Sequence, residues 1–194
     1  NGEKFNLHYL DEGSGHPIIL LHGNPTWSFY YRNLINKLSH HFRVIVPDHV
    51  GHGLSDRPQN YSYQLKDHIH NLQALIQHLK LKKYSLVVHD WGGAIGFGAA
   101  IKNPEQVASI ALLNTAAFTS ERIPLRINIC RTPYLGEFII RGLNGFAYPA
   151  THMAVTKKLD PLVKKGLLFP YPNYHSRIGQ ARFVQYIPLH PKHK

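Results

Sequence analysis

Short apolar runs alternate with longer amphipathic segments over the first 118 residues. The apolar runs predict strands covered on both faces, as in a parallel sheet. A segment of alternating apolar and polar residues at 4–13 predicts a half-exposed strand that stops at Gly13. The apolar runs lie at 17–23, 42–49, 84–88 and 108–115.

Helical spacing of apolar residues fills the gaps between these runs. It is found at 28–40, 65–81 and 94–104, and the second of these carries one continuous apolar stripe from Leu65 to Leu79. Strands that alternate with helices at this spacing are typical of an α/β domain with a mostly parallel sheet.

The pattern changes after Phe118, where no further strand run is found. Six prolines and four glycines between residues 124 and 172 break this part of the chain into short helical segments. We therefore expect two parts, an α/β core at 1–118 and a mostly helical cap at 119–194. The sheet is expected to end in an uncovered edge at the 108–115 strand.

Composition fits a soluble globular domain, with 43% hydrophobic and 17% charged residues among 194. No run approaches the roughly 18 apolar residues of a membrane span, and the polar opening residues do not resemble a secretory leader. Cys130 is the single cysteine. These features predict a cytoplasmic protein without an internal disulfide.

The net charge of +11 is concentrated in the cap, where residues 119–194 hold 12 Lys and Arg against 3 Asp and Glu. Such a segment suits nucleic acid, an anionic membrane, an acidic partner or simply a solvated surface. No nucleic-acid motif accompanies it, so we expect no nucleic-acid partner and favour the solvated surface. The 15 histidines are scattered outside any metal-ligand spacing, so neither a metal nor another cofactor is expected.

Three polar motifs follow three of the predicted strands: HGNPTW at 22–27, DHVGHGLSD at 48–56 and HDWGG at 89–93. Active sites of open α/β sheets lie beyond the carboxyl ends of the strands, where these motifs converge. Asp90 stands at a strand-to-helix turn, where an α/β-hydrolase carries its nucleophile. A carboxylate is already anionic at neutral pH and needs no base to activate it. The alternative is that Asp90 only caps the following helix.

Together the three motifs resemble those of the haloalkane dehalogenases within the α/β-hydrolase superfamily. The resemblance implies an α/β-hydrolase fold in which Asp90 attacks carbon and forms an ester. It further implies that the backbone amides of Asn24 and Trp91 form an oxyanion hole and that their side chains bind the leaving group. It gives structural roles to five neighbours and predicts a cis Asn24–Pro25 peptide bond. Those neighbours are His22, Gly23, Pro25, Gly92 and Gly93.

Stretches outside these motifs, such as LLNTAAF and RFVQYIPLHP, look more like the β-lactone decarboxylases of bacterial olefin biosynthesis. Those enzymes convert a cis-3-alkyl-4-alkyloxetan-2-one into a cis-alkene and carbon dioxide. The resemblance implies a small apolar substrate, an alkyl β-lactone or a haloalkane, and partner enzymes of an olefin-biosynthesis assembly. Epoxide hydrolases are a third relative and would use cap tyrosines, for which Tyr134, Tyr148, Tyr171 and Tyr174 are available.

The family's catalytic His and acid are expected to be absent from this chain. Asn114 occupies the site where a minority of relatives place the acid, and three histidines of the cap and tail match no catalytic position. These are His175, His190 and His193. We therefore expect an enzyme truncated at both ends, without its first sheet strand; the alternative is a non-catalytic binding module.

Overall fold

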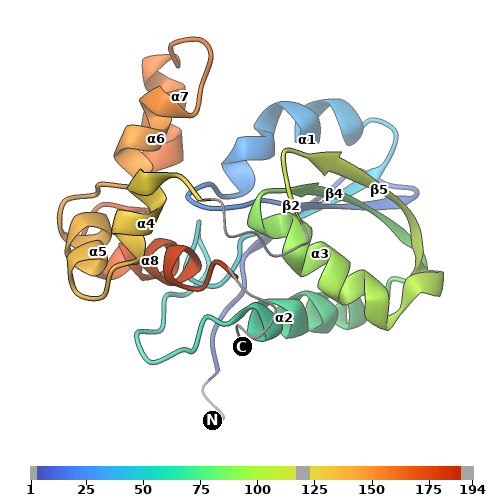
Figure 1. Cartoon of the computed structure of the whole chain (residues 1–194). Coiled ribbons are helices and arrows are strands. Elements are labelled where there is room, and N and C mark those ends of the chain that lie inside the picture. Colours follow the sequence, from blue (N-terminus) through green and yellow to red (C-terminus); the bar gives the residue numbers. More distant parts are fainter. Residues whose placement is uncertain (1–3, 117–122, 189–194) are drawn as a thin grey trace.

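A computed structural model describes residues 4–116 and 123–188 of the chain (Figure 1). Its centre is a five-stranded sheet of order β1-β3-β2-β4-β5, in which β1 is antiparallel and the other strands are parallel. The strands are β1 (Tyr9–Glu12), β2 (Pro17–Leu21), β3 (Arg43–Pro47), β4 (Tyr84–His89) and β5 (Val107–Leu113). The predicted mostly parallel sheet is confirmed.

Helices cover both faces of the sheet because its buried strands are apolar on both sides. Ile19, Leu21 and Ile45 pack with α2 (Leu65–His78) and α3 (Trp91–Lys102). Ile18 and Leu20 point the other way and pack with the segment of the 3-10 helix Ser28–Tyr31 and α1 (Arg32–Leu38). Figure 1 shows α1 on one side of the sheet and α2 and α3 on the other.

The predicted strand at 4–13 is shorter than expected, since only Tyr9–Glu12 pairs in the sheet. The residues before it bond to the loop after β3 instead. The Asn6 N–H donates to Asp56 Oδ2 at 2.7 Å, and the His8 N–H donates to Ser55 Oγ at 2.9 Å. These side-chain acceptors replace a strand ladder for this segment.

The cap consists of short helices. These are α4 (Leu125–Arg131), α5 (Leu135–Glu137), the π-helical turn Phe138–Gly142, α6 (Ala147–Met153), α7 (Pro161–Leu168), the 3-10 turn His175–Arg177 and α8 (Ile178–Gln185); a further 3-10 turn, Pro104–Gln106, precedes β5. Between residues 123 and 188 no strand is found. The predicted boundary between residues 118 and 119 lies outside the described residues and stays a prediction.

One cap helix is tied to the main core. Phe183 of α8 is fully buried and packs in the same cluster as Leu21 and Trp91.

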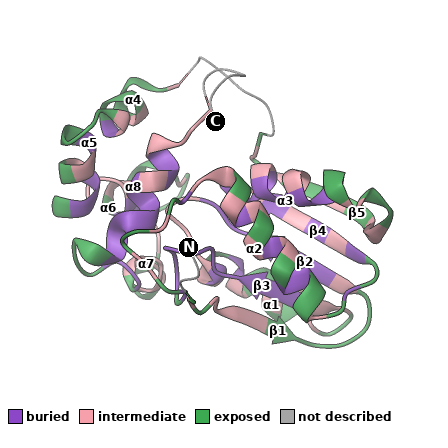
Figure 2. Cartoon of the chain, turned by 90° about the horizontal axis from the view of Figure 1, so that it is seen from below, coloured by how far each residue is buried: buried purple, intermediate pink, exposed green. Residues whose placement is uncertain are grey.

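One edge of the described sheet is formed by β5, and Leu112 on this strand is 58% exposed (Figure 2). The predicted uncovered edge is confirmed for this part of the chain.

Of the helices formed by the described residues, not one is both long enough and apolar enough to cross a membrane.

Candidate active site

Asp90 joins β4 to α3 in a backbone conformation that few residues adopt. Its φ is 51° and its ψ is −123°. Positive φ in a residue other than glycine is uncommon and costs on the order of 1–3 kcal/mol, so the surroundings must hold it in place. The turn presents the carboxylate beyond the end of the sheet.

Two glycines allow α3 to begin at this turn. A Cβ on Gly92 would lie 2.2 Å from the carbonyl oxygen of Leu21, and one on Gly93 would lie 1.8 Å from Thr115 Oγ1. Both distances are too short for any side chain. The helix therefore passes against β2 and the end of β5 only because these positions carry no side chain.

Gly92→Ala is expected to destabilise the fold by about 3 kcal/mol, the upper range for overpacking, because the obstructing Leu21 oxygen belongs to the backbone of a central strand. Urea unfolding measures the loss. The control is Gly142→Ala, whose Cβ would lie 3.2 Å from the movable ring of Phe138. That variant should change stability by less than about 1 kcal/mol. Equal stability of the two variants would contradict the close approach.

The Asp90 carboxylate is held by the loop after β2. Its Oδ1 accepts the Asn24 N–H at 2.7 Å, and the side chain makes no capping hydrogen bond to α3. A Cβ on Gly23 would lie 2.1 Å from the same oxygen, so only glycine lets the loop approach this closely. The alternative that Asp90 merely caps the helix is wrong.

The end of β5 also supports the turn, through the backbone of Asn114 and through Thr115, which the sequence analysis did not name. Thr115 Oγ1 donates to the Asp90 carbonyl oxygen at 2.6 Å, and the Asp90 N–H donates to the Asn114 carbonyl oxygen at 3.3 Å. Asn114 itself has a φ of 41°. The available signal was two polar residues directly after an apolar strand.

His22 links the loops that follow β2 and β3. Its Nδ1 lies 2.9 Å from the Gly23 carbonyl oxygen, and its Nε2 accepts the His49 N–H at 3.0 Å. Complete burial lowers the pKa of His22, so the ring stays neutral with its proton on Nδ1. These bonds fit the structural role expected for His22.

Asn24 connects this loop to the cap. The Asn24–Pro25 peptide bond is cis, which confirms the prediction. The Asn24 side chain donates through Nδ2 to the Gln180 carbonyl oxygen at 3.1 Å, and its Oδ1 lies 3.2 Å from His52 Nε2. Gln180 and His52 are contacts that the sequence analysis did not foresee.

Asp48, the first residue of the second motif, organises the neighbouring loops. It is fully buried and accepts the Ser28 N–H at 2.7 Å, the Leu54 N–H at 3.0 Å and a bond of 2.8 Å from His8 Nδ1. Burial raises the pKa of Asp48, but the bonds from His8 and the two amides outweigh it and leave the pKa below its usual value. Asp48 is thus an ionised structural anchor.

Trp91 and Asp90 line a pocket of about 860 Å³. The Trp91 ring stacks on Phe183 with 4.7 Å between centroids, and its indole N–H has no hydrogen-bond partner among the described residues. Asn24 is not among the residues that line this pocket. The lining is mostly apolar and comprises Leu65, Ile69, Asp90, Trp91, Ala94, Phe97, Gly98, Ile101, Asn114, Thr115, Ala116, Ile123, Ile187 and Pro188.

The remaining candidates lie elsewhere. None of the four cap tyrosines lines this pocket; Tyr171 is buried with its hydroxyl donating to the Thr26 carbonyl oxygen at 3.3 Å, and Tyr134 is 91% exposed. His175 belongs to the 3-10 turn before α8, whereas His190 and His193 lie outside the described residues. Within 4–116 and 123–188, no three His, Cys, Asp or Glu side chains are grouped as a metal site.

The amino-acid sequence of the chain is similar to those of two curated bacterial proteins. The chain is 44% identical to a cis-3-alkyl-4-alkyloxetan-2-one decarboxylase of Shewanella oneidensis, a match covering 98% of this chain and 62% of the relative. It is 40% identical to the protein of the same name from Xanthomonas campestris, covering 95% of this chain and 66% of the relative. The chain thus spans slightly less than two thirds of these relatives.

A solved structure shares the fold closely. The haloalkane dehalogenase DatA from Agrobacterium tumefaciens superposes with a TM-score of 0.86 at 28% identity, covering 95% of this chain and 65% of that one. Residues 16–128 match the family described as the alpha/beta hydrolase fold. This match covers more than half of the chain, and it agrees with the parallel sheet and the sharp turn at Asp90. The chain therefore belongs to the α/β-hydrolase fold family.

Proposed function

We propose that this chain supplies the nucleophile half of a β-lactone decarboxylase. The observation that carries the proposal is the placement of the Asp90 carboxylate. It stands on a sharp turn, is held at 2.7 Å by the Asn24 N–H, and lines a largely apolar pocket beside Trp91. An anionic nucleophile in an apolar pocket suits attack on an uncharged, alkyl-substituted carbon.

In the proposed reaction Asp90 attacks the ring carbon bonded to the lactone oxygen. The new carbon–oxygen bond is an ester to Asp90, and the broken one releases the ring's carboxylate. Loss of that group as carbon dioxide leaves its bonding electrons to form the carbon–carbon double bond. The Asp90 carboxylate is expelled unchanged, so the atoms balance with alkene and carbon dioxide as the products.

Asn24 and Trp91 are the proposed donors to the group that departs. Both carry uncharged N–H donors, which suit a monoanion in an apolar site. No described residue accepts the indole N–H of Trp91, which supports its part in this role. The Asn24 side chain already donates one N–H to Gln180 and retains a second on the same nitrogen. His22, Gly23, Pro25, Gly92 and Gly93 are proposed to act through loop geometry alone.

A haloalkane dehalogenase is the second candidate, supported by the similarity to DatA. Product analysis of the whole protein separates the two. We expect a cis-alkene and carbon dioxide from a cis-dialkyl β-lactone, and little bromide from a bromoalkane. Rapid bromide release without alkene would support the dehalogenase instead. Failure with both substrates would leave the non-catalytic binding module, which uses the same pocket. As part of the first proposal, the whole protein would act in the cytoplasm together with partner enzymes of olefin biosynthesis.

Trp91→Phe is expected to lower kcat about a hundredfold, since loss of one aimed donor costs on the order of 3 kcal/mol in the transition state. The phenyl ring keeps most of the contact with Phe183, so the thermal midpoint should change little. Steady-state kinetics on the β-lactone measures the effect. Trp27→Phe is the matched control, because the Trp27 indole donates to the Gly166 carbonyl oxygen at 3.1 Å in the cap rather than lining the pocket. Equal kcat values for both variants would contradict the role of Trp91.

A further inference from the structure

Helices α6 and α7 form an arm that stands away from the sheet (Figure 1). One side of the arm is anchored to the core. The Trp27 indole donates to the Gly166 carbonyl oxygen at 3.1 Å, and a Cβ on Gly166 would lie 2.5 Å from the Phe29 ring. Gly166 therefore marks the place where α7 contacts the core.

Two large apolar residues of α7 and its C-terminal end are exposed, with a lysine between them. Leu162, Lys165 and Phe169 are spaced three and four residues apart, so they share one helix face. Leu162 is 77% exposed and Phe169 is 65% exposed, and Lys165 is exposed between them. The arm thus presents apolar side chains to its surroundings where a solvated helix would present polar ones.

The connection between α6 and α7 adds positive charge and another apolar side chain. Lys157 and Lys158 are exposed, and Met153 before them is 59% exposed. Asp160 is the single acidic residue of the sequence from 146 to 170. Its Oδ1 accepts the Leu162 N–H at 2.8 Å as a helix cap. The arm therefore has four lysines and one carboxylate, so its net charge is strongly positive.

We propose that this arm binds the surface of a lipid bilayer that contains anionic lipids. Lysines mixed with Leu, Met and Phe on a short helical element are typical of segments that lie in the membrane interface. There the ammonium groups meet anionic headgroups, while the apolar side chains enter the boundary of the acyl region. A protein partner fits less well, because lysine is depleted at the centre of protein interfaces. Nucleic acid would leave Leu162 and Phe169 unexplained.

Sedimentation of the whole protein with vesicles tests the charge. Phosphatidylcholine vesicles containing phosphatidylglycerol should bind the protein, and pure phosphatidylcholine vesicles should not. Replacing the three exposed arm lysines by Gln should weaken binding at least about tenfold, since each lysine near an anionic surface contributes about 1 kcal/mol. The variant is Lys157→Gln, Lys158→Gln and Lys165→Gln.

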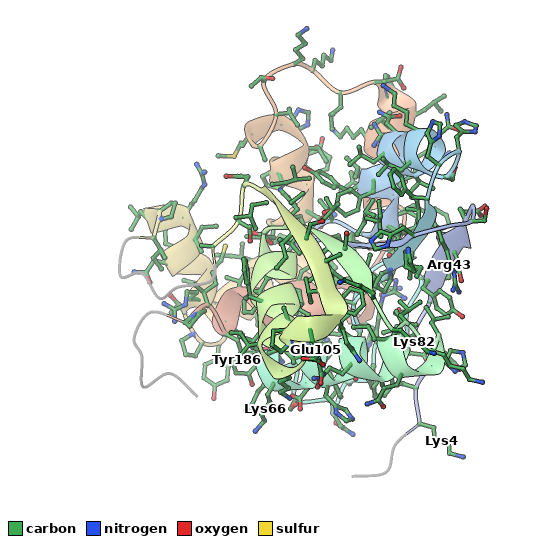
Figure 3. All side chains as sticks on the ribbon, turned by 90° about the vertical axis from the view of Figure 1, so that its right-hand side faces the viewer. Lys4, Arg43, Lys66, Lys82, Glu105 and Tyr186 are labelled. Atoms are coloured by element: carbon green, nitrogen blue, oxygen red, sulfur yellow. The ribbon has the colours of Figure 1, made fainter. Side chains whose placement is uncertain are left out.

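The matched control removes the same charge elsewhere. Lys37, Lys82 and Lys83 are exposed, and Figure 3 shows Lys82 at the end of the molecule away from the arm. The triple Gln variant at these positions should bind within about twofold of wild type. Equal weakening by both triple variants would mean that net charge alone matters, and would overturn the proposal.

The two apolar residues are tested separately by Leu162→Ser with Phe169→Ser. Both side chains are exposed, so the fold should survive, and circular dichroism checks it. Binding should again fall at least about tenfold because burial of two large apolar side chains is lost. Unchanged binding, or no binding of the wild type to the anionic vesicles, would overturn the proposal. Binding is measured without turnover, so the result is independent of the role proposed for Asp90.

Discussion

Acidification from pH 7 to pH 5 is expected to remove several kcal/mol of stability, because four buried histidines fold in the neutral form. His22, His49, His52 and His68 are all fully buried, and burial lowers the pKa of each from 6.5, that of His68 to about 3. Between pH 6.5 and these lower values the unfolded chain binds protons that the folded chain does not. Stability is therefore full above about pH 6.5 and falls as the pH drops.

The size of the effect follows from the number of groups. Each histidine contributes up to about 1.4 kcal/mol per pH unit, so four contribute up to roughly 5 kcal/mol per unit. A whole domain is stable by only about 5–15 kcal/mol. The other shifted groups do not cancel this loss. The raised pKa of His8 adds stability as the pH falls towards 6.5, but it is one group against four, and the lowered pKa of Asp48 matters only below about pH 3.8.

Urea unfolding at pH values from 5 to 8 measures this dependence. His68→Leu should reduce its slope by about a quarter, since neither ring nitrogen of His68 has a hydrogen-bond partner in the described chain and the ring packs on Phe183 at 4.7 Å. His70→Leu, an exposed position on the same helix, is the control and should leave the slope unchanged. A flat profile between pH 5 and 7 would show that the buried rings take up protons as they do in the unfolded chain, and would contradict this prediction.

Asp90→Asn is expected to abolish turnover of the whole protein, with a loss of roughly 10⁴- to 10⁶-fold, the scale seen when a nucleophile is removed. The amide keeps an oxygen that accepts the Asn24 N–H, so stability should change by less than about 1 kcal/mol. Alkene formation from a β-lactone measures turnover, and urea unfolding checks the fold. Asp160→Asn, which preserves a helix cap in the arm, is the matched control and should retain activity.

Intact-mass analysis gives a second readout of the same substitution. A reactive bromoalkane should add one alkyl group to the wild-type protein and to Asp160→Asn, but none to Asp90→Asn. Alkylation of Asp90→Asn at the wild-type rate would place the nucleophile elsewhere. A wild-type rate of alkene formation by freshly prepared Asp90→Asn would contradict the proposed reaction in the same way.

The sequence by itself determined the sheet and the sharp turn at Asp90. Four apolar runs became β2 to β5 because residues without polar side chains must be covered on both faces, and the chain can cover them only with the intervening helices. Asp90 followed by Trp91 and two glycines predicted a sharp strand-to-helix turn, since the pattern is local and its chemistry is specific. The cis bond before Pro25 was implied by the resemblance to the haloalkane dehalogenases.

The tertiary structure alone decided which distant residues hold the turn at Asp90 and the loop that contacts it. Asn24 bonds to Gln180 across 156 positions of sequence, and Thr115 supports Asp90 across 25. The burial of four histidines likewise follows from how α2 and α8 pack over the loops after β2 and β3. No periodicity records such contacts, because each depends on where separate elements meet in space. The polar residues of the three motifs were therefore found by spacing, but their partners were set by packing.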